Sequence, residues 1–375
     1  MRRPVAERPR SPMRRQRVRI ATVYRRGPIA STMRARMSYI RWMRVSEALA
    51  RLGYTVDIIT DSPDRSLASL PNLQCSPYSA VDWRRYDVVK TLFHMGVESL
   101  IGAGGGDHPF IISKLGSVVG PTDKEPGVYF FGDEWRALAE TQEWISRHSQ
   151  YLTVLTEPSM RLWQRQFGTG QPLLLVPTGV DPEIPAPRHN PYAEIEGKVA
   201  VYIGNLYEGT QREVNLYWQH RLNAIGRLLR RRGIQLCVLG PGQVDQLDAA
   251  AVTWLGHVDN EAVWDYQYFA DVGVVLAQGA VQHSESSKIY YYLRSGLPVV
   301  SEAPVPNNDL IHDLSFGYVA DYGADEQMVD MIERAARQSW QKEKAMRYLA
   351  SQHSWDCRCQ IYDELLRREF GLDDE

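Results

Sequence analysis

The sequence is poor in cysteine and has no long apolar run. Its four cysteines, in a chain of 375 residues, are too few and too scattered for the disulfide framework of a small secreted domain, and they lack the second pair that a zinc site requires. No apolar run reaches the roughly eighteen residues of a membrane-spanning helix, and no signal-peptide core follows the arginine-rich start. These absences predict a protein of the reducing cytoplasm.

A large excess of one charge is also lacking overall, although the charges are unevenly placed. The formal net charge is −2, yet residues 1–187 hold 25 basic against 18 acidic side chains, so the remainder is acidic. Eight arginines fall within the first nineteen residues, with Glu7 as the only acid there. We interpret residues 1–17 as a disordered basic arm, either a solvated tail or a peripheral contact with the anionic inner face of a membrane. We expect no nucleic-acid partner.

The familiar glycine-rich phosphate loops are missing as well. The stretch Gly104-Gly105-Gly106-Asp107 has neither the Gly-Lys-Ser/Thr ending of a P-loop nor the spacing of a dinucleotide fingerprint. We interpret it as a flexible turn. A phosphate site in this chain must therefore be built in another way.

What the sequence does contain is a regular alternation of strands and helices. Strand, loop, long helix and strand follow one another between residues 19 and 60, which is the pattern of a βαβ unit in a parallel sheet. Further strands are expected at residues 86–92, 109–112, 127–131, 151–155 and 173–177. Residues 18–180 are thus predicted to form a doubly wound, Rossmann-like α/β domain.

A proline-rich stretch then interrupts the pattern, and we interpret residues 181–198 as a linker. The alternation restarts after it, so that residues 199–352 are predicted to form a second Rossmann-like domain of the same class. A last apolar-periodic segment within residues 353–375 predicts a terminal helix that crosses back to the first domain. Two domains also suit the length of the chain.

The most informative stretch is Ser284–Val300. Ser286 or Ser287 can cap a short helix, Gly296 can end it in a left-handed conformation, and a buried strand follows. Lys288 then lies in the first helical turn, where free backbone N–H groups and the helix dipole favour an anion. This arrangement predicts a phosphate site.

In doubly wound sheets, ligands bind beyond the carboxyl ends of the strands. Two such domains joined by a linker can face each other across a cleft, so the loops that follow strands are the candidate binding residues. In the second domain these loops contain Gly204, Asn205, Gly240, His257, Val258 and the Ser284–Lys288 stretch. In the first domain they contain Arg25, Arg26, Gly27, His94, Asp133 and Glu134.

Taken in order, the fragments VYIGN, VLGPG, TWLGHVDNEAVW, ADVGVVLA and SESSKIYYYLRSGLPVV make the second half resemble the nucleotide-sugar domain of GT-B glycosyltransferases. The likeness extends from Arg44–Tyr54 near the start to His353-Ser354-Trp355 near the end. It implies two Rossmann-like domains facing across a cleft, with the donor bound by the second domain and the acceptor by the first. It also implies a nucleotide diphosphate sugar as donor substrate, with a UDP-sugar favoured and no metal or other cofactor required.

The sequence departs from the retaining group 1 glycosyltransferases, many of which carry two glutamates eight positions apart around this helix. His283 and Tyr291 occupy the two places here, and Asn205 does not resemble the Arg and Lys pair of those enzymes. A closer likeness is to the xanthan-type glucuronosyltransferases, which are inverting enzymes with a motif similar to Tyr129–Asp133. In that family the aspartate matching Asp133 is the catalytic base.

The resemblance and the chemistry of an inverting transfer together assign roles. Such a transfer needs a base for the acceptor hydroxyl and positive charge for the departing diphosphate. Asp133 is the predicted base, with Glu134 as its substitute, while a helix cap is the simpler role for Asp133. The remaining assignments are Lys288, Ser286 and Ser287 for the diphosphate, Glu285 for ribose or sugar hydroxyls, Tyr291 for the cleft, His257 and Val258 for the nucleotide base, His94 for orienting the acceptor, and Arg25 and Arg26 for an acceptor phosphate.

We therefore predict a hexosyltransferase-type glycosyltransferase that moves a sugar from a nucleotide diphosphate to a glycan or lipid-linked saccharide, with inversion. Three alternatives stay open: a retaining transferase of the same fold, a sugar-nucleotide epimerase, and a non-catalytic protein that binds nucleotide or polysaccharide. The sugar, the nucleotide base and the acceptor cannot be deduced from the sequence.

Overall fold

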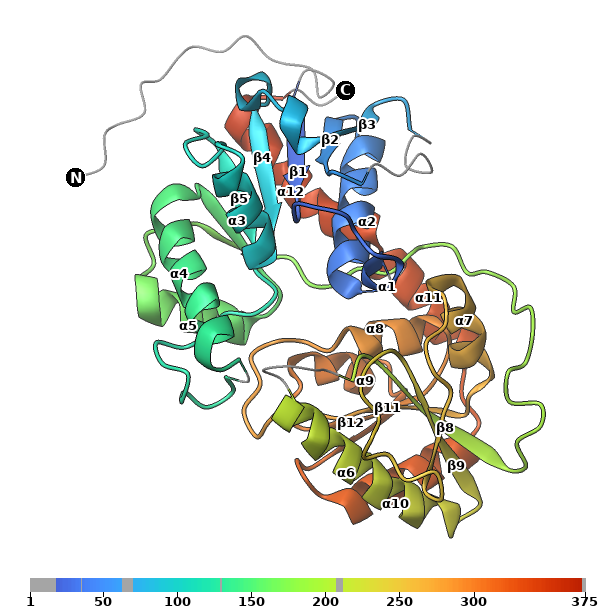
Figure 1. Ribbon diagram of the computed structural model, residues 1–375. Helices are drawn as coiled ribbons and strands as arrows, with labels where there is room; N and C mark the ends of the chain where they lie inside the picture. Colours follow the sequence, from blue (N-terminus) through green and yellow to red (C-terminus); the bar gives the residue numbers. More distant parts are fainter. Residues whose placement is uncertain (1–17, 35, 63–69, 129, 207–211, 373–375) are drawn as a thin grey trace.

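The computed structural model describes residues 18–34, 36–62, 70–128, 130–206 and 212–372. They form two α/β units, each built on one parallel sheet, which lie one above the other in Figure 1. The predicted basic arm at residues 1–17 and Tyr129 of the predicted motif lie outside the described residues. No helix in the described ranges is both long enough and apolar enough to cross a membrane.

The first sheet has seven parallel strands in the order β3-β2-β1-β4-β5-β6-β7. The order reverses between β1 and β4, which is the place where a doubly wound sheet opens a crevice for a ligand. The strands are β1 (Arg19–Val23), β2 (Thr55–Ile59), β3 (Leu73–Ser76), β4 (Val88–Leu92), β5 (Ile111–Lys114), β6 (Tyr151–Val154) and β7 (Leu173–Leu175). Its helices are α1 (Ser31–Arg34), α2 (Met37–Arg51), α3 (Phe93–Gly102), α4 (Gly132–His148) and α5 (Glu157–Phe167).

The second sheet has six parallel strands in the order β10-β9-β8-β11-β12-β13, and its crevice lies between β8 and β11. The strands are β8 (Lys198–Ile203), β9 (Ile234–Leu239), β10 (Val252–Trp254), β11 (Val272–Val275), β12 (Val299–Glu302) and β13 (Gly317–Ala320). The helices that follow along the chain are α6 (Arg212–Arg230), α7 (Asn260–Phe269), α8 (Ser287–Arg294), α9 (Asp309–Asp313), α10 (Asp325–Arg337), α11 (Lys342–Gln352) and α12 (Trp355–Phe370).

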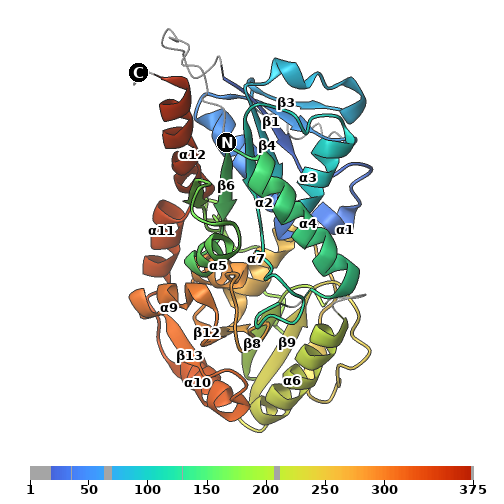
Figure 2. The same cartoon turned by 90° about the vertical axis from the view of Figure 1, so that its left-hand side faces the viewer.

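Helix α12 belongs to the core of the first unit although it ends the chain. Ser354 caps its start by accepting a hydrogen bond from the backbone N–H of Cys357, and Gly371 ends it with a left-handed φ of 60°. One apolar side of the helix, which includes Trp355, Tyr362 and Phe370, is buried against α2 and the first sheet. Figure 2 shows α11 and α12 following one another along one side of the molecule, from the second unit to the first.

The doubly wound architecture predicted from the sequence is confirmed in both units, but one predicted strand is wrong. Within residues 127–131, the described residues form no strand. Strand β5 pairs directly with β6, so the sheet leaves no place for another strand between them. The segment instead approaches the second unit, because a Cβ atom on Gly127 would lie 2.7 Å from the carbonyl oxygen of Val281. Gly127 has a φ of 84°, which favours glycine at this turn.

Candidate functional site

A cavity of about 640 Å³ lies between helices α1 and α2 of the first unit and the strand-end loops of the second. Its volume is in the range of pockets that enclose small organic ligands. The basic side chains that line it are Arg34, Arg36, Arg44, Lys288 and Arg294, and the acidic ones are Glu47, Asp181 and Glu261. The excess of basic residues favours an anionic ligand. The cavity also has apolar side chains, namely Met37, Ile40, Met43, Leu239, Val258, Val263 and Trp264.

Lys288 lies on the floor of this cavity against the end of β8. A Cβ atom on Gly204 would be 2.7 Å from Cε and 3.0 Å from Nζ of Lys288, so only glycine leaves room for the ammonium group here. The ammonium also lies 5.0 Å from the centroid of the Tyr202 ring. Burial lowers the pKa of Lys288 to about 8, and no carboxylate in the described ranges is among the causes of this shift. The site thus holds a cation that a bound anion would stabilise.

Tyr292 fixes the backbone beside this lysine. Its hydroxyl oxygen accepts a hydrogen bond from the N–H of Ile203 at 2.8 Å, at the point where β8 ends before Gly204. The ring fits against β11 because residue 273 is glycine. A Cβ atom at this position would lie 2.4 Å from the Tyr292 ring. Helix α8 therefore holds both the lysine and the strand end that the lysine approaches.

Tyr291 faces the cavity from the same helix. Its hydroxyl is buried and has no hydrogen-bond partner among the described residues, and burial raises its pKa above the usual range. A buried hydroxyl without a partner costs free energy unless a ligand or water satisfies it. The predicted position of Tyr291 in the cleft agrees with this placement, and its role there is still a prediction.

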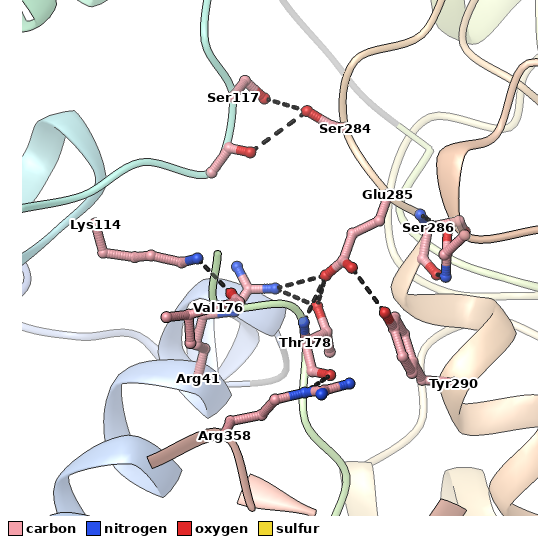
Figure 3. A network of polar contacts seen from close by, with 12 residues as sticks. Arg41, Lys114, Ser117, Val176, Thr178, Ser284, Glu285, Ser286, Tyr290 and Arg358 are labelled. Carbon is pink, nitrogen blue, oxygen red and sulfur yellow. Dashed lines mark hydrogen bonds and ion pairs between the residues drawn. The ribbon is translucent and has the colours of Figure 1, made fainter. Parts of the chain in front are cut away.

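The other predicted residues of the second unit divide into two groups. Gly204, Asn205, Gly240, His257, Val258 and Ser287 line the cavity with Lys288. Glu285 and Ser286 do not. Ser286 is the N-terminal cap of α8 without a side-chain cap bond, and its N–H donates to Asn307 Oδ1 at 2.9 Å. The carboxylate of Glu285 is held by Thr178 and Tyr290 instead (Figure 3).

The structure turns the predicted arginines after β1 toward their own unit. Arg25 donates to the sulfur of Met33, and Arg26 donates to the carbonyl oxygen of Gly102 and lies over the ring of Tyr78. The N–H of Gly27 donates to Asp61. These residues do not line the cavity, which takes its first-unit cations from Arg34, Arg36 and Arg44 instead.

His94 follows β4 at a strained turn. Phe93, the residue before it, has a φ of 56°, which is rare for an aromatic residue. The Phe93 ring fills space beside Gly116, where a Cβ atom would lie 2.2 Å from it. Burial lowers the pKa of His94, whereas Glu98 and Glu134 oppose this shift. The turn therefore brings His94 within electrostatic reach of Glu134.

Asp133 lies in the first turn of α4 and is open to solvent. Its side chain is 92% exposed and forms an ion pair with Arg136 at 2.9 Å. Asp133 and Glu134 do not line the cavity, and the residues described before them form no strand. The structure thus leaves both carboxylates on the first unit, outside the cavity that contains Lys288.

Sequence reasoning missed a group of charged residues on the cavity wall. Arg44 forms ion pairs with Glu47 and with Asp181, the latter at 2.8 Å, while Arg294 donates to the carbonyl oxygens of Asp181 and Glu183. Arg44 and Arg294 come from helices of different units. A helical arginine among apolar neighbours is the signal that could have suggested Arg294, but nothing local pairs it with α2.

No three His, Cys, Asp or Glu side chains in the described ranges gather in a way that could hold a metal ion. The lining residues offer instead one ammonium, several guanidinium groups and the start of α8, which together suit a phosphate or diphosphate.

Comparison with known proteins gives a consistent picture of the fold. No family model matches the chain, and no curated protein matches it either. Solved structures do. Sucrose-phosphate synthase from Thermosynechococcus elongatus superposes with a TM-score of 0.68 at 13% identity, over 95% of this chain and 100% of that one. Anabaena HepE, in complex with UDP and glucose, gives 0.66 at 12% identity, over 94% and 100%.

WaaG, a glycosyltransferase of lipopolysaccharide biosynthesis, gives a TM-score of 0.61 at 16% identity, over 93% of this chain and 99% of that one. At these identities the likeness concerns the fold. Because the match covers both units and the two sheets have the expected parallel order, the chain has the GT-B fold of these glycosyltransferases.

Proposed function

We propose that this protein is a glycosyltransferase that transfers a sugar from a nucleotide diphosphate sugar to an acceptor hydroxyl. The observation that carries the proposal is the contact of Lys288 with Gly204 on the floor of the cavity. This contact leaves a half-buried cation and the start of a helix at a space that suits a nucleotide. The UDP and glucose of the Anabaena HepE complex support a UDP-sugar as the donor class.

In this proposal the second unit binds the donor and stabilises the leaving group. The bond between the sugar C1 and the diphosphate oxygen breaks, and the negative charge that develops on the diphosphate is met by Lys288 and by backbone N–H groups at the start of α8. Ser287 lines the cavity beside them. Loop residues Gly240, His257 and Val258 then contact the nucleoside.

The acceptor belongs to the first unit in this proposal. Its hydroxyl oxygen attacks C1 from the face opposite to the diphosphate, which inverts the anomeric configuration, and a carboxylate at the start of α4 takes the hydroxyl proton. Asp133 is the proposed base because of the resemblance to the xanthan-type enzymes. Glu134 is its substitute, and the proximity of Glu134 to His94 supports that second assignment. A saccharide, free or lipid-linked, is the proposed acceptor.

The proposal is tested by thermal unfolding in a panel of nucleotide sugars, followed by transfer assays with the donor that binds. A ligand at about a hundred times its dissociation constant stabilises a protein by about 2.7 kcal/mol, which is readily measured. We expect UDP-sugars to raise the unfolding temperature and the Lys288→Ala variant to lose this response. Failure of every nucleotide sugar to stabilise the wild-type protein would reject the proposal.

The products then separate the mechanisms. Proton NMR of the first product reports the anomeric configuration, and we expect inversion. Retention would favour the retaining alternative, turnover of donor without an acceptor would favour an epimerase, and binding without any turnover would favour a non-catalytic protein. Asp133→Asn and Glu134→Gln, compared in one assay, identify the base: the true base loses turnover while donor binding is kept.

A further inference from the structure

The loop that leads into α8 is attached to the first unit by three consecutive residues. The carbonyl oxygen of His283 accepts hydrogen bonds from the hydroxyls of Thr156 and Ser159, at the start of α5. The hydroxyl of Ser284 donates to the carbonyl oxygen of Gly116 and approaches the hydroxyl of Ser117 (Figure 3). The phosphate-binding turn therefore begins only one residue after a segment that is held by the other unit.

Glu285 is the third of these residues, and it has the largest set of contacts. Its side chain is 2% exposed. One carboxylate oxygen accepts from the backbone N–H of Thr178 at 2.6 Å and from the Thr178 hydroxyl, and the other accepts from the Tyr290 hydroxyl at 2.9 Å. Arg41 of α2 lies 4.0 Å away and donates to the Thr178 hydroxyl (Figure 3). Glu285 thus holds three parts of the molecule together: the segment at Thr178, helix α2 through Arg41, and helix α8 through Tyr290.

Three cations surround this carboxylate, of which Arg41 and Lys114 are buried and Arg358 is half-buried. Lys114 donates to the carbonyl oxygen of Val176, and Arg358 donates to that of Thr178, as Figure 3 shows. Burial and the neighbouring Arg41 lower the pKa of Lys114, and Glu285 opposes this shift. A buried carboxylate among cations holds them together, and its removal leaves them uncompensated and mutually repelling.

We propose that Glu285 is a positioning residue. It aligns the proposed phosphate-binding turn at Lys288 with the first unit, which holds the acceptor in the proposed function. The proposal rests on the function proposed above. Glu285 itself does not line the cavity, so it acts through the turn that it fixes and not as a ligand of the donor. Lys288 and Gly204, the proposed contacts of the diphosphate, both lie within the second unit, whereas transfer also requires the correct placement of the first unit. Loss of Glu285 should therefore separate these two steps.

The test compares Glu285→Gln with Asp57→Asn, a matched control. Asp57 is also a buried carboxylate with several donors, namely Gln74, Ser76 and Tyr86, but all of them lie within the first unit. Thr178→Val serves as a second variant, because it removes the hydroxyl contact of Glu285 without changing a charge. The measurements are the dissociation constant of UDP, kcat and KM for transfer, and the radius of gyration from X-ray scattering.

For Glu285→Gln we expect kcat to fall about tenfold or more while the dissociation constant of UDP changes less than about threefold, and the radius of gyration to increase. Thr178→Val should change kcat in the same direction and less. Asp57→Asn should leave the radius of gyration and kcat unchanged even if it lowers the unfolding temperature. An equal loss of UDP affinity and kcat would make Glu285 a donor ligand and overturn the inference. An unchanged kcat and radius of gyration in both Glu285→Gln and Thr178→Val would overturn it too. Scattering requires no substrate, so it tests the placement of the units separately from transfer. The inference can therefore fail while the proposed function holds, and the proposed function can fail while the placement of the units is confirmed.

Discussion

The two walls of the cleft differ in how they use their strand-end residues. In the second unit, residues after β8 and β9 and the first turn of α8 converge on one cavity, with Lys288 against Gly204. In the first unit, residues after β1 turn back onto their own unit, as Arg26 does toward Gly102. The second unit thus places its strand-end loops on the cavity, whereas the first contributes mainly through helices α1 and α2. In the proposed function the diphosphate contacts therefore come from the second unit, and transfer needs both units.

The largest effect is expected from Gly204→Ala, which changes the side of the cavity that the second unit forms. The new methyl group would lie 2.7 Å from Cε of Lys288, and the lysine can move away because it is the far end of a flexible side chain. The fold should tolerate this, while the ammonium leaves the phosphate position. A hydrogen bond to a charged group contributes about 1.5–3 kcal/mol, so UDP affinity should fall by about 10- to 100-fold.

Calorimetric titration with UDP checks this prediction, with thermal unfolding to confirm that the variant is folded. Gly279→Ala is the matched control, since its nearest contact would be 3.7 Å away and its loop follows β11 in the same unit. Equal UDP affinity in Gly204→Ala and the wild-type protein would show that the contact with Lys288 has no part in binding.

The next effect concerns the cost of keeping Lys288 charged. Burial lowers its pKa to about 8 from an ordinary 10.5, so between these values the unfolded chain binds more protons than the folded one. The free energy of unfolding should therefore rise with pH from about 8 to about 10.5. At pH 7 Lys288→Met should stabilise the ligand-free protein by about 1–2 kcal/mol, while UDP affinity falls by about as much as in Gly204→Ala.

Urea unfolding at pH 7 and at pH 9.5 measures both parts of this prediction. Lys90→Met is the comparison in the first unit, because Lys90 is buried on β4 and its pKa is also lowered to about 8. It should stabilise the protein similarly and leave UDP affinity unchanged. A Lys288→Met variant that is less stable than the wild-type protein at pH 7 would show that the ammonium is not under strain in the free cavity.

The parts of the site that the sequence predicted are those that one short segment determines. The stretch from Ser284 to Gly296 contains its own helix start, helix end and lysine, so the position of Lys288 in the first helical turn at the cavity could be predicted from spacing and from the strand-end rule. The rule worked less well for Asp133, because the residues described between 127 and 131 form no strand and Gly127 lies close to Val281. The assignment of Asp133 as base therefore depends on the family resemblance.

Contacts between the units were beyond the reach of the sequence. The pairing of Arg44 with Asp181 and the attachment of Glu285 to Thr178 join residues that are 137 and 107 positions apart. No helical or strand period links such positions, and they meet only in the tertiary structure. The left-handed backbone of Phe93 could not be predicted either. A positive φ favours glycine, and the sequence has an aromatic residue at this position.

A smaller effect is expected from Tyr291→Phe, which removes a hydroxyl that helix α8 of the second unit places at the donor cavity. The hydroxyl has no partner among the residues that the structure describes, so its removal should leave the free energy of unfolding unchanged or slightly raised. If the hydroxyl bonds to the donor, UDP affinity should fall by about three- to tenfold, the effect of one neutral hydrogen bond.

Tyr292→Phe is the matched control one residue further along α8. It removes the acceptor of the Ile203 N–H group and should cost about 1 kcal/mol of stability, because that backbone group becomes buried without a partner. The two tyrosines should therefore exchange their phenotypes, with binding affected at one position and stability at the other. Unchanged UDP affinity in Tyr291→Phe would exclude its hydroxyl from the donor site.

The smallest effect is expected at Arg25, in the loop after β1, which contacts its own unit. Its guanidinium donates to Met33 and does not line the cavity, whereas Arg36 does, so Arg25→Ala should change KM for donor and acceptor less than about twofold. Arg36→Ala should raise KM for an anionic substrate about three- to fivefold, and this increase should shrink in 0.5 M salt because a partly exposed charge is screened. Initial rates at low and high salt measure both variants. A larger effect at Arg25 than at Arg36 would mean that the loop after β1 turns into the cleft when the acceptor binds, and the contrast between the two walls would then hold only for the free protein.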